Sequence, residues 1–194
     1  MGFSDRGKNT KSVFYKVFFK LLGENSFHEM KVNQVIHLSG KSKGSFYHHF
    51  TNLEDLAVSA CRNQTNRVIA AISNQSEDGH LIDEIPIILG LNDELPDDAA
   101  RRLFELRLTA DSYQKLQQAF RDDYETRLRL LTCMFDKAIA QGKVRRDLDS
   151  ASIAGWIYNC IYGVFYSHFS VDNQANKNEQ VKSQLRMLTK LISV

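Results

Sequence analysis

Proline is almost absent from this chain, whose 194 residues include only two prolines and ten glycines. Because proline interrupts helices and glycine weakens them, this scarcity favours an all-helical protein. Long apolar runs are also lacking, and no stretch approaches the roughly 18 apolar residues of a membrane span. The first residues are charged and lack the apolar segment of a secretion signal. We therefore expect a cytoplasmic protein that does not contact a membrane.

Cysteine is scarce too, and the three cysteines, Cys61, Cys133 and Cys160, lie far apart. An odd number at such spacing does not form a disulfide framework, and no Cys/His spacing is typical of a zinc site. We therefore expect no metal and no cofactor. No pair of carboxylates and no nucleophile–base set supports catalysis either, so an all-helical enzyme is the least favoured of the functions considered.

Positive charge is concentrated at one end of the chain. The net charge is +2, but the first 50 residues contain eight lysines and arginines against three acidic residues, which gives +5 there and leaves −3 for the rest. A basic first quarter on a mildly acidic body indicates that this end meets a polyanion.

The apolar residues recur at helical spacing through most of the chain. Residues 1–9 read as a basic, mobile arm, and helices are expected over 10–22, over two short segments before and after Gly40, and over 51–72, where Thr51 and Glu54 match a capping box. Residues 73–98 form a boundary with a short helix inside it. Further helices are expected over 96–110, over a long amphipathic segment that carries Leu116 and ends at Gly142, over 150–170 and over about 179–192.

The stretch around Gly40 is the most informative part of the sequence. Gly40 allows the left-handed conformation that a sharp turn between two helices needs, and Ser42 can cap the second helix. Phe46 and Phe50 are expected in the core together with Phe27. A helix, a tight turn with glycine and a second short helix form a helix-turn-helix, a motif that places its second helix in the major groove of DNA.

The run from Ser39 to Phe50, followed by Thr51–Leu56, resembles the DNA-binding domain of the tetracycline-repressor (TetR) family, and the match extends from about Thr10 to about Ala60. The resemblance implies an all-α fold of about nine helices, with a three-helix DNA-binding domain over 1–56 and a helical ligand-binding and dimerisation domain over 57–194. It also implies a homodimeric repressor that leaves a palindromic operator when a small-molecule effector binds.

The DNA contacts are expected on and beside the second short helix, since family members use the matching positions. Three positions depart from the family pattern: Met30, Lys41 and Leu53. They leave open a second function, that of a helical protein that binds small molecules and whose DNA binding is weakened or lost. The residues expected to contact double-stranded DNA are Lys31, Ser42, Lys43, Gly44, Ser45, Tyr47 and His48.

Two further sets of residues are predicted in the second domain. Apolar and aromatic side chains at helical spacing can line a ligand cavity, or they can simply fill the core. The residues that we predict to line a cavity are Phe104, Leu108, Tyr113, Phe120, Tyr124, Phe135, Trp156 and Cys160. The resemblance implies a twofold interface formed by the last two helices, with an intramolecular core as the alternative. The expected interface residues are Ile153, Ile157, Ile161, Phe165, Leu185 and Leu188.

Overall fold

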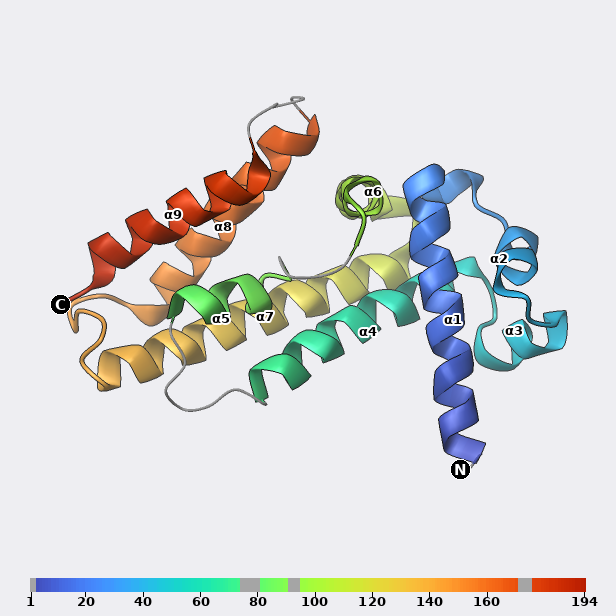
Figure 1. Cartoon of the computed structure of the whole chain (residues 1–194), viewed down its shortest axis with the longest axis horizontal. Helices are drawn as coiled ribbons and strands as arrows, with labels where there is room; N and C mark the ends of the chain where they lie inside the picture. Colours follow the sequence, from blue (N-terminus) through green and yellow to red (C-terminus); the bar gives the residue numbers. More distant parts are fainter. Residues whose placement is uncertain (1–2, 74–80, 91–94, 171–175) are drawn as a thin grey trace. The chain divides into compact units, whose positions relative to one another are not determined.

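A computed structural model describes residues 3–73, 81–90, 95–170 and 176–194 of the chain. Over these residues the protein is all-α, and its one extended pairing is an isolated bridge between Val144 and Ser193. The elements, coloured along the sequence in Figure 1, are α1 (Phe3–Glu24), the 3-10 helix η1 (Phe27–Glu29), α2 (Val32–Ser39), α3 (Lys43–His49), α4 (Leu53–Ser73), α5 (Leu81–Ile88), α6 (Asp97–Thr109), the 3-10 helix η2 (Ala110–Ser112), α7 (Gln114–Ala140), α8 (Ser150–Ser170) and α9 (Lys177–Ile192).

The helices are divided between two compact units. Unit 1 comprises Met1–Asn66 and Asp93–Asp123, and unit 2 comprises Arg67–Asn92 and Tyr124–Val194. The predicted boundary at residue 56 concerns which residues bind DNA, and it stays a prediction. As a packing unit, the first part of the protein is larger than that domain, because it also contains α6 and the first turns of α7.

The core of unit 1 is built around α1, which presents buried Phe14, Phe18 and Leu22. Phe14 makes edge-on contacts with Phe46 and Phe50, at ring-centroid distances of 5.5 and 5.8 Å. Such aromatic contacts stabilise a core beyond the area they bury. The expected burial of Phe27, Phe46 and Phe50 is thus confirmed.

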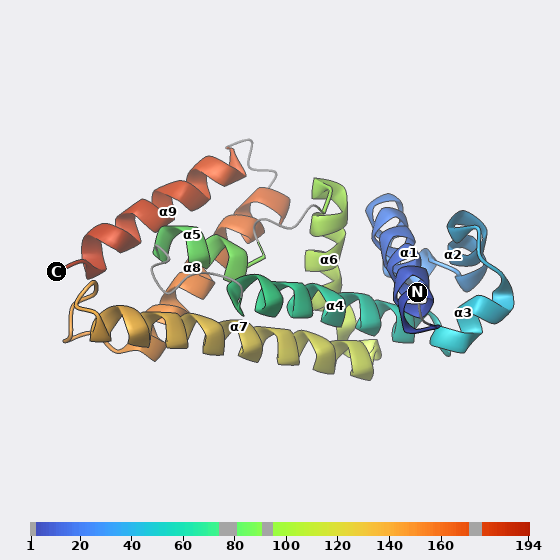
Figure 2. The same ribbon diagram turned by 60° about the horizontal axis from the view of Figure 1, so that its bottom comes forward.

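Helix α6 packs on α1, and the two backbones approach closely at Gly23. A Cβ atom at Gly23 would lie 3.3 Å from the backbone nitrogen of Ala99. Figures 1 and 2 both show α6 beside α1, although 72 residues of sequence lie between Glu24, the end of α1, and Asp97, the start of α6. The tail of α6 and the start of α7 complete this core with Leu106, Leu116 and Phe120.

Unit 2 has a core of its own, formed by α5, α7, α8 and α9. Its most deeply buried side chains include Phe135, Ile157 and Ile161. The last helix is fastened at its end, since Arg145 donates a backbone hydrogen bond of 2.9 Å to the carbonyl of Ile192. Pro86 lies within the short helix α5, in the region where the sequence predicted a boundary with one short helix.

Two expectations about the first unit are wrong. Residues 3–9 are not an arm, because α1 already begins at Phe3. Thr51 and Glu54 do not form a capping box: Asn52 caps α4 by accepting the Asp55 N–H, and Thr51 bonds the carboxylate of Asp55 instead. The expected helices elsewhere are present, with ends that differ by a few residues. None of the described helices is long and apolar enough to span a membrane.

Candidate nucleic-acid interface

The turn between α2 and α3 is set by Gly40. Its φ of 62° and ψ of 18° lie in the left-handed region, which side chains with a Cβ atom seldom adopt. A Cβ atom there would have no neighbour within 4 Å, so the backbone conformation, and not space, requires glycine. The backbone N–H of Lys41 then donates to Ser39 Oγ at 3.2 Å, which continues the turn towards α3.

Helix α3 is capped at its start and anchored from below. Ser42 Oγ accepts the backbone N–H of Ser45 at 3.1 Å, as the sequence predicted for this cap. Phe46 is fully buried and Phe50, just past the last turn, is 3% exposed. Because these two rings hold the inner side of a helix of only seven residues, Lys43, Tyr47 and His48 are left exposed on its other side.

The outward surface of α3 combines a cation, a hydroxyl and an imidazole. Lys43 and His48 are exposed, and Tyr47 is 48% exposed, with the Lys43 Nζ 6.0 Å from the centre of its ring. Gly44 is exposed between them and has only Ser42 Oγ, at 3.9 Å, near a hypothetical Cβ. The first turn is therefore thin enough for close approach to a flat or grooved surface. Ser45 is half-buried beside it.

Lys31 lies one helix away, at the start of α2. Its backbone N–H donates to Gln34 Oε1 at 2.7 Å, which satisfies one of the first donors of α2, and its side chain is exposed. The amino ends of α2 and α3 therefore both carry an exposed lysine. Helix amino ends and ammonium groups are among the groups with which proteins hold phosphates.

The three departures from the family pattern do not disturb the fold. Met30 is 5% exposed and belongs to the core, and Leu53 packs against the same core. Lys41 is exposed instead of buried, so it adds a positive charge next to Lys43. Lys41 was not among the residues predicted to contact DNA, although it directly follows the turn glycine and is exposed like Lys43.

A hollow of about 330 Å³ lies beside the end of α3, within unit 1. His49 forms part of its wall, together with Tyr15, whose hydroxyl shares a 2.7 Å hydrogen bond with Ser59 Oγ. Burial lowers the pKa of His49, and the neighbouring positive charges of His48 and Lys11 lower it further. His49 therefore belongs to the wall of this hollow, whereas His48 faces outward.

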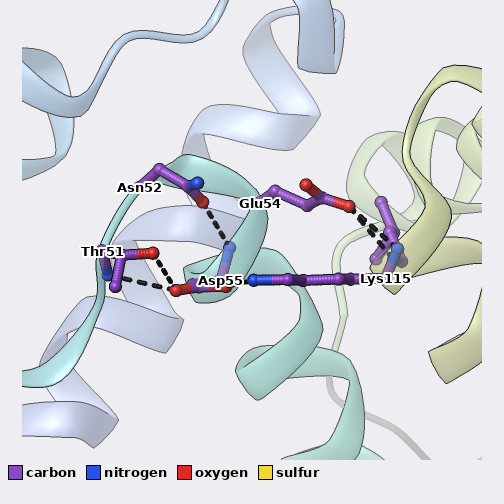
Figure 3. Close-up of polar contacts among 6 residues, drawn as sticks. Thr51, Asn52, Glu54, Asp55 and Lys115 are labelled. Atoms are coloured by element: carbon purple, nitrogen blue, oxygen red, sulfur yellow. Dashed lines mark hydrogen bonds and ion pairs between the residues drawn. The ribbon is translucent and has the colours of Figure 1, made fainter.

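The start of α4 is tied to the start of α7 by two adjacent carboxylates, as Figure 3 shows. Glu54 Oε1 accepts the backbone N–H groups of Lys115 and Leu116 at 3.1 and 3.4 Å, so it caps α7 from outside that helix. Asp55 Oδ1 pairs with Lys115 Nζ at 3.0 Å. The hydrogen bond from Thr51, followed by that from Lys115, lowers the pKa of Asp55.

A second polar tie joins α4, α6 and α7 inside unit 1. Asp123, 3% exposed, accepts Thr65 Oγ1 at 2.6 Å and Arg107 Nη2 at 2.9 Å. The Arg107 guanidinium also lies 4.7 Å from the ring centre of Phe120. Buried charges need such partners, because an unpaired carboxylate in a core is strongly destabilising. Burial raises the pKa of nearby Cys61 to about 12, which keeps that thiol protonated.

The residues predicted to line a ligand pocket are divided between the two units. In unit 1, Phe120 is in the core and Leu108 is 62% exposed; in unit 2, Phe135 is in the core and Trp156 is largely exposed. Tyr113 contacts Phe27 and shares a 2.9 Å hydrogen bond with His28 Nδ1. Phe104 and Cys160 are half-buried, and Tyr124 is exposed with its ring against that of Tyr158.

The residues predicted at a dimer interface lie mainly in the core of unit 2. Ile153, Ile157, Ile161, Leu185 and Leu188 are all buried there, and Phe165 is half-buried against the same core. The five buried side chains therefore fill the core of their own chain, which agrees with the alternative of an intramolecular core, and the residues that meet a partner chain stay a prediction. The physical reason is that α8 is apolar on more than one side, so its pattern does not reveal which side is internal.

Among the residues that the structure describes, no group of three or more histidine, cysteine or acidic side chains is arranged to hold a metal ion. Protein-family models do not match the sequence, and no curated protein is significantly similar to it. The structural comparisons, in contrast, are extensive.

The chain has the architecture of a helix-turn-helix protein with an all-helical body. More particularly, the fold is that of the TetR-family transcriptional regulators. The regulator of that family from Cytophaga hutchinsonii matches with a TM-score of 0.74 at 17% identity, covering 97% of both chains. Salmonella enterica GusR matches with a TM-score of 0.70 at 22% identity, covering 94% of this chain and 96% of its own. A proposed regulator from Saccharomonospora viridis, solved in complex with choline, matches at 0.77 and 14%, covering 96% and 99%.

Proposed function

We propose that the protein is a DNA-binding transcriptional regulator whose helix α3 enters the major groove. The observation that carries this proposal is the contrast between the two sides of α3. Phe46 and Phe50 anchor its inner side in the core, while Lys43 and Tyr47 project from a thin first turn. A short helix with an exposed cation and a hydroxyl is suited to base edges and phosphates.

Each predicted contact has a distinct role in this proposal. Lys43 reads a guanine edge or holds a phosphate, and Tyr47 donates its hydroxyl to a phosphate. Gly44 allows the backbone to approach, and Lys41 adds a further phosphate contact. Ser42 and Ser45 begin the helix, and Lys31 and His48 complete the surface on either side. Phosphate contacts by several lysines make DNA binding strongly dependent on salt concentration.

We propose a homodimer formed by the outward faces of α8 and α9. Trp156 and Tyr166 on α8 are 43% and 54% exposed, and Met187 and Leu191 on α9 are 54% and 57% exposed. Such large apolar side chains at the surface of two neighbouring helices are typical of a protein interface. Gly155 on α8 leaves open space in which a partner helix can approach. Twofold symmetry would present two α3 helices to a palindrome.

The regulator would respond to a small molecule bound in unit 2, and its action as a repressor is part of the same proposal. The choline in the Saccharomonospora viridis structure is an organic molecule bound to a protein of this fold. Here, α4 and α7 each continue from unit 1 into unit 2. The tie of Glu54 and Asp55 to Lys115 joins the starts of these two helices, next to α3. An effector that favours a different arrangement of α7 would therefore also change the arrangement of α4 and of α3, the helix that we propose to enter the major groove.

DNA selection from random duplexes, followed by gel shifts with the recovered sequence, tests the proposal. Wild-type protein should select a palindrome, and Lys43→Ala should lower its affinity roughly 5- to 150-fold, the range of a good base contact. Lys137→Ala, which removes the same charge from the exposed side of α7, is the matched control and should bind as wild type does. Failure of wild-type protein to enrich any sequence would instead support the helical protein without DNA binding.

A further inference from the structure

A row of aromatic rings runs along one side of α8 in unit 2. Tyr158, Tyr162, Phe165 and Phe169 follow one another at spacings of three and four residues, which places them on one face of a helix. Tyr158 and Tyr162 stack at 4.3 Å, and the ring centres of Phe165 and Phe169 are 5.8 Å apart. The ring of Tyr124 closes the row with an edge-on contact to Tyr158 at 4.9 Å.

The end of this row already holds a cation of the protein itself. The Lys177 Nζ lies 5.6 Å from the ring centre of Phe165 and 5.3 Å from that of Phe169. Both distances are within the range in which an aromatic face attracts an ammonium group. Lys177 comes from α9, whose first turn lies beside the last turn of α8 in Figures 1 and 2.

The position of Lys177 along its own helix makes this contact more informative. It is the first residue of α9, directly after the capping residue Asn176. The positive end of a helix dipole disfavours an ammonium group there. The attraction of the two rings opposes this unfavourable interaction. The rings, and not the helix terminus, therefore make this part of the protein suited to a positively charged group.

Two buried polar atoms, one in the last turns of α8 and one in the first turn of α9, lack a partner. His168 Nδ1 and Gln180 Oε1 are buried without a hydrogen-bond partner among the described residues. The His168 ring lies 5.0 Å from that of Phe169, and Gln180 is one turn after Lys177 on α9. An amide oxygen can only accept a hydrogen bond, and an imidazole nitrogen accepts one in one tautomer. Buried polar atoms without partners are costly, so a ligand that donates hydrogen bonds would relieve this cost.

We propose that the end of the α8–α9 pair binds a small alkylammonium ion, a protonated amine, and that the Lys177 side chain occupies the site in the ligand-free protein. The amine would displace Lys177 from the faces of Phe165 and Phe169 and donate its N–H groups to Gln180 and His168. This inference rests on the proposed function and deepens it, because it assigns a chemical class to the effector of unit 2.

The test uses n-butylammonium, which reproduces the end of a lysine side chain, titrated into the full-length protein by calorimetry in the absence of DNA. n-Butanol is the neutral control, and tetramethylammonium is a cation without N–H donors. We expect saturable binding of butylammonium at millimolar concentration, weaker binding of tetramethylammonium and none of butanol. Equal binding of butanol would overturn the proposal, because it would indicate an apolar pocket without preference for charge.

Two substitutions should change this binding in opposite directions. Lys177→Gln removes the internal competitor and should tighten butylammonium binding roughly threefold or more, whereas Phe169→Leu removes one aromatic face and should weaken it by a similar factor. Lys190→Gln removes the same charge from α9, 13 residues further on, and should leave binding unchanged.

The opposite signs separate a ligand site from a purely structural contact. If Lys177 only fastened α9 to α8, Lys177→Gln would lower the melting temperature and create no amine binding; this result would overturn the proposal. A Phe169→Leu protein that failed to fold would leave the decision to Lys177→Gln, whose effect does not depend on it. DNA binding is measured separately, so loss of the amine site would not be confused with failure of the regulator function.

Discussion

The outward faces of α3 in unit 1 and of α8 in unit 2 differ in chemistry and also in how they can be recognised. In α3, Gly40 and the Ser42 cap determine where the helix begins, and the two phenylalanines determine which side is internal. In α8, apolar residues occur on the inner face and on the outer face alike. The comparison teaches that a helix is easy to orient when a turn, a cap and a small set of anchors accompany it, and hard to orient when hydrophobicity alone is available.

The largest expected effect comes from charging the two sides of α8. Ile157 is fully buried, so Ile157→Asp places a carboxylate without a partner in the core of unit 2 and should cost about 4 kcal/mol or more of stability. Trp156, the residue before it in the chain, is exposed, and Trp156→Asp should leave the circular dichroism nearly unchanged while producing a monomer, with at most the loss of melting temperature that dissociation itself causes.

Light scattering of both variants measures whether they are dimers, and thermal melts measure whether their core is intact. Together they show which side of α8 is the core and which is the interface. A folded, monomeric Ile157→Asp protein would show that the inner face is in fact the interface. A dimeric Trp156→Asp protein would place the partner elsewhere on the surface.

The same contrast can be drawn within α3. Phe46→Ala removes a fully buried ring that contacts Phe14 and should cost about 3–5 kcal/mol of unfolding free energy. Tyr47→Ala should cost less than about 1 kcal/mol of stability, because its side chain is nearly half exposed, and yet weaken DNA binding by about 1–3 kcal/mol. Urea denaturation and binding titrations measure the two quantities separately. Wild-type DNA affinity in Tyr47→Ala would remove this residue from the interface.

Much of unit 1 could be predicted from the sequence, because its determinants are local. The turn and the cap of α3 each depend on residues a few positions apart, and the three core phenylalanines stand out in the sequence as large apolar residues in short, otherwise polar segments. The role of Glu54 could not be predicted in this way. A threonine three residues before a glutamate matches a local capping box, but Glu54 accepts N–H groups from a helix 61 residues further on. A carboxylate at the surface of α4 can reach either helix terminus, and only tertiary packing selects one.

In unit 2 the helices were predictable and the function of their faces was not. Ile153, Ile157 and Ile161 were assigned to a partner chain, although the core of the same chain needs them. The aromatic row was likewise missed, since Tyr158, Tyr162 and Phe169 were not singled out in the sequence. Its signal was the aromatic spacing along α8 together with a lysine at the first position of α9, which is an unfavourable place for a cation.

A smaller effect is expected at the tie between α4 and α7. Glu54→Ala removes the acceptor for two N–H groups of α7 and should lower stability by about 1 kcal/mol, the usual contribution of a helix cap. Glu125→Gln, on the exposed side of α7, is the control and should change little. If the tie transmits an effector signal, Glu54→Ala should also reduce the change in DNA affinity that an effector produces. An unaltered effector response would assign the tie to stability alone.

The tie also predicts a modest dependence on acid. The folded-state pKa of Asp55 is lowered, so this group stabilises the protein above its unfolded value of 3.8, and the contribution is lost as the pH falls further. Asp55→Asn should therefore remove part of the acid sensitivity of the melting temperature below that pH. An identical pH profile in the variant would show that Asp55 does not contribute to it.

The smallest effect is chemical and leaves stability unchanged. Cys133 is exposed, whereas Cys61 is buried with a pKa of about 12 and burial also raises the pKa of Cys160. A thiol reagent should therefore label Cys133 first, Cys160 slowly and Cys61 only after denaturation, as mass spectrometry of labelled peptides can measure. Rapid labelling of Cys61 in the folded protein would contradict the packing of unit 1.

The late place of Lys115 and Leu116 in the sequence has a consequence for the folding of unit 1 during protein synthesis. The ribosome synthesises α1 to α4 first. The core that holds α3, however, also contains Leu106, Leu116 and Phe120, and Glu54 forms its hydrogen bonds with the start of α7. A nascent chain that ends before α6 therefore contains the helix-turn-helix sequence but lacks part of the hydrophobic core on which it packs. Under the proposed function, products of premature termination would therefore compete poorly for DNA, and their incomplete core would leave them open to proteolysis.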